Sequence, residues 1–334
     1  MKGRSATIRD VARHAAVSVA SVSRALNGLN SVHPETRARV VASAKTLGYV
    51  PHAGARSLSM ARTHAIGVVL PDLHGEFFSE IVRGMDRETG ARGYHLLLSN
   101  MHADAELAAQ AMRSMRGRVD GLIVMAPQLD ATGLDEALPP GVPAVLVNAR
   151  DPGGHAGMRI DNAAGIDALV AHLVGSGRRD LVHIAGPAGN IDGDERRASF
   201  AAAMARHAPD RPVRIVAGNF REEGGQQAVA ALLREDAAFD AIVAANDMMA
   251  LGALTALRTA GVDAPGAVAV TGFDDIPLAR YLGLTTVRLH LAEMGARAVA
   301  RLVDTLEGAE DARTLELVTP ELVVRTTTPD RTSP

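Results

Sequence analysis

Residues 7–27 read TIRDVARHAAVSVASVSRALN and constrain the fold more than any other part of the chain. Positions 8, 11, 12 and 15 are apolar, which is the spacing of one buried helix face, and Thr7 stands where a helix N-cap belongs. The pattern breaks at 16–18, and Ser18 can cap a second short helix. Two short helices joined by a tight turn predict a helix-turn-helix that enters a DNA major groove, although a helical hairpin with no nucleic-acid role has a similar pattern.

The two faces of the second helix differ in character. Its inward face is expected to carry Val22, Ala25 and Leu26. Its outward face carries small or apolar side chains and one cation, at Val19, Ala20, Ser23 and Arg24. A lone arginine on the free face of such a helix suits a base edge or a phosphate.

Charge is distributed unevenly along the 334 residues. The net charge is −3, from 35 Lys and Arg against 38 Asp and Glu, but residues 1–62 carry ten basic and only two acidic residues. A basic amino-terminal part on an acidic remainder predicts that only the former contacts a polyanion. The length also predicts two domains or more.

A third helix is expected from Pro34 to Leu47, ended by Gly48. Residues 1–50 would then form a small three-helix domain. The next stretch, 51–62, is basic and too short to be stable as an isolated helix, so by itself it indicates a flexible linker.

From Thr63 onward, apolar runs alternate with helical stretches. The runs are AIGVVLPD, HLLLSN, GLIVMAP, PAVLVN, LVHIAG, VRIVAG, AIVAAND and VAVTGFDD. Continuous apolar runs indicate strands buried on both faces, and the alternation predicts parallel, doubly wound sheets. The rhythm restarts after Asp161, and the helix after LVHIAG is expected from Glu195. Two such series predict two similar α/β lobes, with a cleft lined by the polar residues that follow the strands.

Other classes of protein fit less well. The sequence has no cysteine and scattered histidines, so neither a disulfide framework nor a metal site is expected, and no cofactor is implied. MKGRSATIRD lacks the apolar segment of a secretory signal, and no run approaches the roughly 18 apolar residues of a membrane span, so a cytoplasmic protein is expected.

The motifs GxSxG, GxxxxGK[ST] and HExxH are absent from the sequence, which disfavours an enzyme. A sugar-binding protein of the periplasmic type would share the two lobes. It would, however, need an export signal, and it would have no use for a basic amino-terminal segment.

The order of helix-turn-helix, basic tether and two lobes resembles the LacI/GalR family of bacterial transcription repressors over essentially the whole chain. The resemblance rests on residues 7–27 and on VHPETRARVVASAKTLGYVPHAGARSL, GVVLPDLHGEFFSEIVRGM, VAANDMMALGAL and VAVTGFDDIPLARYLGLTTVRLHLAEMG. It implies an all-α helix-turn-helix domain at 1–50, a hinge at 51–62 and a periplasmic-binding-protein-like α/β core at 63–334. The core would consist of two doubly wound parallel-sheet lobes, about 63–161 with 291–324 and about 162–290 with 325–334.

The resemblance also implies which residues contact DNA. Val19 and Ala20 would begin the recognition helix, and Arg24 would donate to a base edge or a phosphate, whereas Ser21 and Thr36 would bond phosphates. In the family, a leucine of the paired hinge helices wedges into the minor groove. The full set implied for DNA binding is Thr7, Ser18, Val19, Ala20, Ser21, Ser23, Arg24, Thr36, Ala55, Arg56 and Leu58, the last being that leucine. Gly54 and His52 depart from the family pattern, and Gly54 weakens the hinge helix.

For the effector cleft, the resemblance implies that Arg196 and Asp274 grip ligand hydroxyls and that Phe220 stacks on the ligand. The full implied set is Phe77, Asp161, Arg196, Phe220, Asn246 and Asp274. Two of these have structural alternatives, because Asp161 could instead cap the helix that begins at 162, and Phe77 or Phe78 could be core. Leu289 stands where the family often has glutamine, so the identity of the effector cannot be copied from a well-known member.

The expected protein is therefore a homodimeric repressor of a pseudo-palindromic, double-stranded DNA operator, switched by a small molecule. A carbohydrate is the favoured effector, and a purine or nucleoside is the alternative. A non-exported sugar-binding protein is the rival class.

Overall fold

The computed structural model describes residues 6–27, 32–50, 62–101, 104–125, 129, 131–149, 154–235, 237–309 and 314–330. The chain divides into an N-terminal unit, residues 1–65 with 117–120, and a core unit, residues 66–116 with 121–334.

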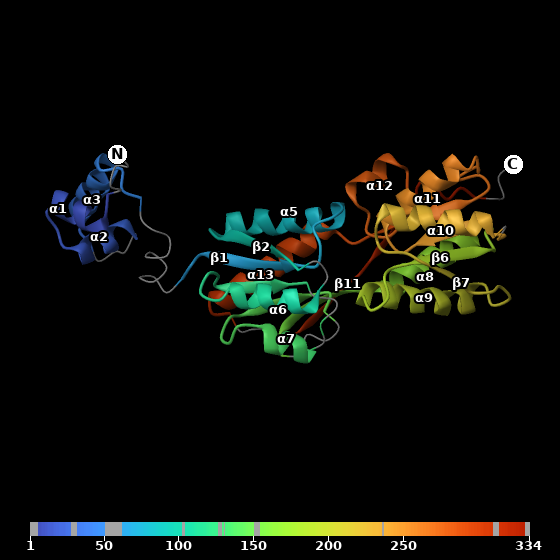
Figure 1. Cartoon of the computed structure of the whole chain (residues 1–334), viewed down its shortest axis with the longest axis horizontal. Coiled ribbons are helices and arrows are strands. Elements are labelled where there is room, and N and C mark those ends of the chain that lie inside the picture. Colours follow the sequence, from blue (N-terminus) through green and yellow to red (C-terminus); the bar gives the residue numbers. More distant parts are fainter. Residues whose placement is uncertain are drawn as a thin grey trace. The chain divides into compact units, whose positions relative to one another are not determined.

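The described residues of the N-terminal unit form three helices (Figure 1): α1 (Ile8–His14), α2 (Val19–Leu26) and α3 (Pro34–Thr46). Their apolar faces meet in a small core made of Val11, Ala12, Ala15, Val22, Ala25, Val32, Val40 and Ala44. The spacing that predicts the first two helices therefore also identifies the side chains that hold them together. Leu26, expected inside, is half-buried at the edge of this core.

Side-chain caps fix where the first two helices begin. Thr7 and Asp10 form a capping box at α1, in which each side chain bonds the backbone N–H of the other. Ser18 accepts a hydrogen bond from the backbone N–H of Ser21, 3.1 Å away, and so caps α2. Between the two helices Ala16 has a positive φ of 52°, which produces the sharp turn. Both caps match the positions expected from the sequence.

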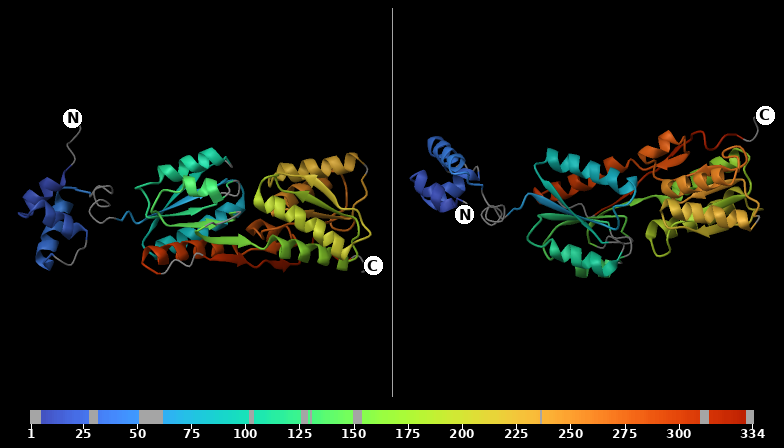
Figure 2. Two further views of the ribbon diagram at one scale, coloured as in Figure 1. Left: turned by 90° about the horizontal axis from the view of Figure 1, so that it is seen from below. Right: turned by 45° about the horizontal axis from the view of Figure 1, so that its top comes forward.

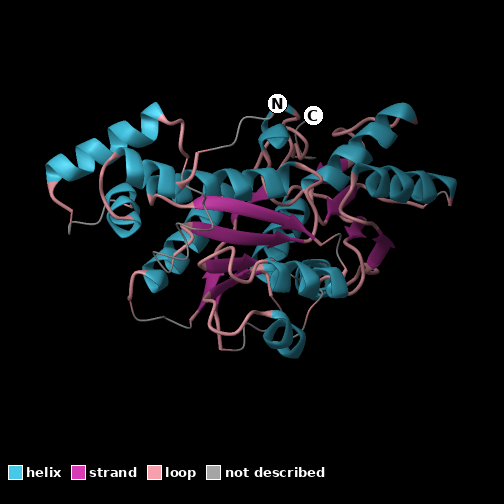
Figure 3. Ribbon diagram, turned by 60° about the vertical axis from the view of Figure 1, so that its left-hand side comes forward, coloured by secondary structure: helices cyan, strands magenta, loops and turns pink. Residues whose placement is uncertain are grey.

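The core unit contains a first sheet of six strands. Their spatial order is β11 (Leu315–Val318), β5 (Ala156–Ile160), β4 (Ala144–Val147), β3 (Gly121–Val124), β1 (Ala65–Leu70) and β2 (His95–Asn100). The pairs β1–β3, β3–β4, β4–β5 and β5–β11 are all parallel. Two helices pack together on each face (Figures 2 and 3), namely α5 (Glu76–Ala91) with α13 (Leu291–Leu306), and α6 (Ala105–Ser114) with α7 (Ala131–Ala137).

The second sheet is smaller and repeats this plan. Its parallel strands lie in the order β7 (Arg214–Ala217), β6 (Leu181–Ala185), β8 (Ala241–Ala244) and β9 (Ala269–Thr271). The helices again pack in pairs, α8 (Asn162–Gly175) with α9 (Ile191–His207), and α10 (Glu222–Arg234) with α11 (Asp247–Thr259). Helix α9 begins four residues before the expected Glu195, because Asn190 caps the backbone N–H groups of Asp192 and Gly193.

The chain passes between the two sheets three times. It leaves the first sheet after β5, returns through α12 (Pro277–Tyr281) and β10 (Thr286–Arg288) into α13, and crosses again between β11 and β12 (Glu321–Val323). Strands β10 and β12 pair antiparallel, with Thr286 opposite Val323. Three crossings place the carboxyl ends of both sets of strands where a ligand could contact them together.

Candidate functional site

The outward face of α2 is open to solvent. Val19, Ala20 and Arg24 are exposed, and Val19 has 41% of its surface accessible. The Nε of Arg24 donates to the carbonyl oxygen of Ala20 at 3.3 Å, which holds the side chain along the helix. Ser23 is half-buried and accepts a hydrogen bond from the Asn27 side chain at 3.4 Å.

The remaining candidates for DNA contact differ in what they already bind. Thr7 and Ser18 are engaged as helix caps, and the hydroxyls of Ser18 and Ser21 lie 2.9 Å apart. Thr36 is half-buried in the first turn of α3. Ala55, Arg56 and Leu58 lie outside the described residues.

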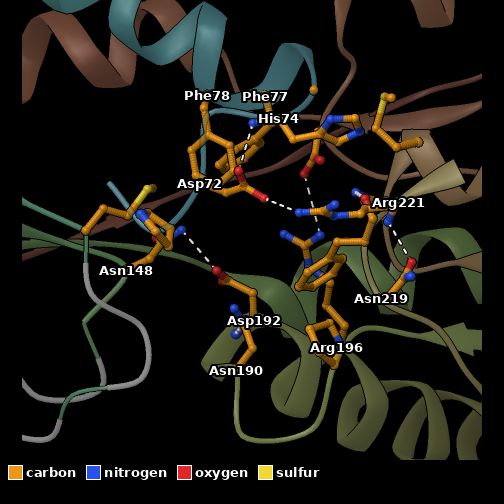
Figure 4. A pocket seen from close by; sticks show the side chains of 18 residues that line it. Asp72, His74, Phe77, Phe78, Asn148, Asn190, Asp192, Arg196, Asn219 and Arg221 are labelled. Carbon is orange, nitrogen blue, oxygen red and sulfur yellow. Dashed lines mark hydrogen bonds and ion pairs between the residues drawn. The ribbon is translucent and has the colours of Figure 1, made fainter. Parts of the chain in front are cut away.

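A cavity of about 240 Å³ lies at the carboxyl ends of both sheets, within the core unit (Figure 4). Its lining combines aromatic rings, methionines, amides and charged groups. The lining residues are Pro71, Asp72, His74, Gly75, Phe77, Phe78, Met125, Asn148, Pro187, Asn190, Asp192, Arg196, Asn219, Phe220, Arg221, Asn246, Met248 and Asp274. Apolar and aromatic side chains together with polar groups that fix a ligand's orientation are typical of small-molecule sites.

Arg196 and Asp274 form a buried ion pair in this cavity, 3.5 Å apart, with side chains 3% and 5% exposed. The guanidinium also donates to the side-chain oxygen of Asn162 at 2.8 Å and to the carbonyl oxygen of Ala245. It lies 3.8 Å from the centre of the Phe273 ring, a cation–π arrangement. Arg196 is therefore held from several sides, with its orientation set before any ligand arrives.

Three of the seven described non-glycine residues with a positive φ line the cavity. Asn148, Phe220 and Asp274 all have positive φ values, of 52°, 64° and 114°. Each follows a strand, β4, β7 or β9, at the edge where the two sheets face the cavity. Non-glycine residues are rarely found in this region of backbone space, and functional sites are where such strain tends to persist.

The carboxyl group of Asp274 is unusually basic. Burial raises its pKa to about 7, the charge of Arg196 opposes that shift, and the charge of Asp192 adds to it. Asp247 lies behind Asp274, also buried, and burial followed by the charge of Asp274 raises its pKa as well. The Asp247 carboxylate accepts hydrogen bonds from the backbone N–H of Ile276 and from the hydroxyl of Thr286, so it ties α11 to strand β10.

Several contacts join the first sheet to the second across the cavity. The side chain of Asp72, after β1, accepts a hydrogen bond from Arg221, at the start of α10, at 2.8 Å. Asn148, after β4, donates to Asp192 of α9 at 3.1 Å. Figure 4 shows both links bridging the opening. Burial opposes the charge on Asp72, but backbone N–H groups and Arg221 together lower its pKa.

Five of the six effector residues implied by the sequence line the cavity: Phe77, Arg196, Phe220, Asn246 and Asp274. Asp161 is not among the lining residues. Its carboxylate instead accepts from the backbone N–H of Ala164 at 2.9 Å and caps α8, which is the structural alternative considered above. Phe77 and Phe78 both line the cavity, with their rings edge to face at 5.1 Å.

The implied set omitted several charged and amide residues of the lining. They are Asp72, His74, Asn148, Asn190, Asp192, Asn219 and Arg221. Asp72 and Asn148 follow strands, and that position already predicts a place at the cleft. Asp192 and Arg221 sit at the starts of helices, where a polar residue usually indicates a cap, so no signal in the sequence separates a lining role from a capping role.

Two other features are absent from the described residues. Across the described ranges, no cluster of three or more histidine, aspartate or glutamate side chains is arranged to hold a metal ion. No helix within those same ranges is long and apolar enough to cross a membrane.

An open recognition-type helix in one unit and a small-molecule cavity in the other define a ligand-responsive DNA-binding protein. Comparison with known families agrees. Residues 7–52 match the model for bacterial regulatory proteins of the lacI family, and residues 170–328 match that for a periplasmic binding protein-like domain.

Individual relatives match along nearly the whole chain. The HTH-type transcriptional regulator GalS of Salmonella typhimurium is 34% identical over 324 residues, covering 96% of this chain and 95% of GalS. A lac repressor dimer bound to operator and the anti-inducer ONPF superposes with a TM-score of 0.87 at 28% identity, covering 98% and 100%. A complex of the transcriptional regulator CelR with cellobiose gives 0.70 at 28% identity, covering 96% and 99%. The chain belongs to the lacI family of bacterial regulatory proteins.

Proposed function

We propose that this protein is a transcriptional repressor that binds a two-fold symmetric operator as a homodimer. A sugar, or sugar derivative, bound in the core cavity changes its affinity for the operator. One observation carries the proposal: an exposed helix-turn-helix face and a cavity containing the Arg196–Asp274 pair belong to one chain. Neither feature alone implies regulation, but together they supply a surface that binds DNA and a site where a ligand can control that binding.

The DNA-binding half of the proposal rests on α2. Val19 and Ala20 begin the helix and offer apolar contacts, for example to a thymine methyl group, while Arg24 can read a guanine or a phosphate. Two such helices in a symmetric dimer would read the two halves of a palindrome. The lac repressor relative is a dimer bound to its operator, which supports this arrangement.

The effector half rests on the chemistry of the cavity. A guanidinium and a carboxylate can each bond two neighbouring hydroxyl groups, and aromatic faces suit the apolar side of a sugar ring. Arg196 and Asp274 supply the first, and Phe77 and Phe220 supply the second. The CelR relative holds cellobiose, which supports a carbohydrate as the ligand class.

In this proposal residues 1–50 bind DNA, 51–62 link them to the core, and the first and second sheets belong to two lobes. A ligand that binds one arrangement of the lobes better than another shifts the balance between them. That shift changes the separation of the two linkers in the dimer and hence the fit to the operator. The protein acts in the cytoplasm, where bacterial DNA lies, and does not transform its effector.

Footprinting of purified protein on DNA from its own genomic neighbourhood tests the proposal. A protected two-fold symmetric site, whose protection changes when a binding sugar is added, is the expected result. Protection with no symmetry, or protection that no cavity ligand alters, would contradict it. Recovery of the added sugar unchanged after incubation distinguishes a receptor from an enzyme.

A further inference from the structure

The positively charged side chains that line the cavity are already paired with carboxylates of the protein. Among the described lining residues, two guanidinium groups, Arg196 and Arg221, face three carboxylates, Asp72, Asp192 and Asp274. Each guanidinium has a carboxylate partner, Asp274 at 3.5 Å for Arg196 and Asp72 at 2.8 Å for Arg221. The third carboxylate, on Asp192, is bonded by amide groups rather than by a cation.

His74 does not alter this balance. Its Nε2 lies 3.2 Å from a carboxylate oxygen of Glu222, so any positive charge on the imidazole would also be matched. The described lining therefore offers an anionic ligand group a cation only at the expense of an existing pair. Breaking the buried Arg196–Asp274 pair leaves a buried charge without its partner, which is costly. The Arg221–Asp72 pair is more exposed, at 51% and 33%, so displacing it costs less.

Helix N-termini attract anions, and four of them, those of α5, α9, α10 and α11, begin at or near the cavity. Each already carries acidic residues in its first turn: Glu76 in α5, Asp192 and Asp194 in α9, Glu222 and Glu223 in α10, and Asp247 in α11. The side chains of Asn190 and Asn246 also occupy first-turn N–H groups of α9 and α11. The positive ends of these helices are thus already matched by groups of the protein.

We infer that the effector carries neither a phosphate nor a carboxylate group. This inference rests on the proposed function. It narrows the proposed ligand class to uncharged polyhydroxylated molecules and excludes sugar phosphates and sugar acids. The neutral amides of the lining remain suited to hydroxyl groups.

Matched ligand pairs test the inference on the full-length protein. Calorimetry or thermal shift would compare glucose with glucose 6-phosphate and gluconate, galactose with galacturonate, ribose with ribose 5-phosphate, and cellobiose with cellobionate. For whichever pair binds, the anionic member is expected to bind at least about tenfold more weakly than the neutral one, because its charge can reach a cation only by displacing a carboxylate of the protein.

A charge variant sharpens the test. Asp72→Asn removes the partner of Arg221, and the ratio of anionic to neutral binding should rise by at least about fivefold, because one cation is then free for the ligand. Asp135→Asn is the control, since it removes the same charge from an exposed side chain of α7 outside the cavity lining, and it should leave the ratio unchanged. An equal effect of both variants would overturn the inference.

The outcomes separate this inference from the proposed function. If an anionic member binds as well as its neutral partner or better, the inference is wrong and a sugar-responsive repressor still stands. If no member of any pair binds, the proposed sugar ligand is wrong and the inference is lost with it.

Discussion

The guanidinium of Arg196 and the carboxylate of Asp274 lie 3.5 Å apart, almost completely shielded from solvent, although one belongs to α9 and the other to the turn after β9. Removing either partner would leave a buried charge uncompensated. The pair therefore links the integrity of the second sheet to the chemistry of the cavity. A ligand that bonds Asp274 also acts on the turn that leads into α12 and strand β10, which is the route toward the first sheet.

Protonation of Asp274 should make the stability of the core depend on pH. Its pKa is raised to about 7, above the ordinary value of 3.8, so between these values the folded state retains a proton that the unfolded state has lost. The free energy of unfolding should therefore fall as pH rises through this window. Asp274→Asn should reduce the slope, with a remainder from Asp247, whose pKa is also raised. Urea denaturation at about pH 4.5 and about pH 7 measures the change in the free energy of unfolding between these two pH values. An identical change in the wild-type protein and in Asp274→Asn would contradict the assignment.

Asp161→Ala should affect stability and leave effector binding unchanged. The carboxylate caps α8, and loss of such a cap costs about 1 kcal/mol. Chemical denaturation should show that loss, while calorimetry with a sugar that binds the wild-type protein should give an unchanged affinity. Asp274→Ala is the comparison and should lose affinity sharply. A large loss of affinity in Asp161→Ala would restore this residue to the effector site.

Arg24→Ala should weaken the preference for the operator without changing effector affinity. Its exposed guanidinium lies on the outward face of α2, and loss of one bidentate contact to a base costs about 1–3 kcal/mol. Binding measured against salt concentration should also show a smaller slope. Arg13→Ala is the matched control, because it removes an exposed charge from α1 and should preserve sequence preference. A collapse of effector affinity in Arg24→Ala would mean that the two units do not act as separate modules.

The sequence predicts elements well where local chemistry decides them. Thr7 and Ser18 are caps in the structure, as their neighbours indicate, because a cap depends on residues three positions away. The sequence predicts the start of α9 four residues too late, because Asn190 lies just after Gly189, in a stretch that looks like a loop. Strand runs in the core were recognisable because their burial on two faces excludes polar residues.

The cavity was less predictable, because its members come together only through the folding of two sheets. Arg221 and Asp72 are separated by 149 positions, yet they form a single contact across the opening. Resemblance to a family transfers residues at matched motifs, and on that basis Arg196 and Phe220 are expected in the effector cleft. The resemblance gives no reason to expect Asp192 rather than Asp161 in the cavity lining, because both are acidic residues at helix starts. Only the tertiary structure separates their roles.

Gly84→Ala should destabilise the core unit through the contact between α5 and α13. A Cβ at Gly84 would stand 1.8 Å from the carbonyl oxygen of Ala292, which is backbone and cannot rotate away, so the two helices would have to separate. Overpacking of this kind costs about 1–3 kcal/mol or more. Gly90→Ala is the control in the same helix, because a Cβ there meets nothing within 4 Å, and it should stabilise by about 0.5–1 kcal/mol through reduced backbone entropy. Thermal unfolding of the two variants should therefore shift in opposite directions, and a stabilising shift in Gly84→Ala as well as in Gly90→Ala would show that α5 does not depend on close approach to α13.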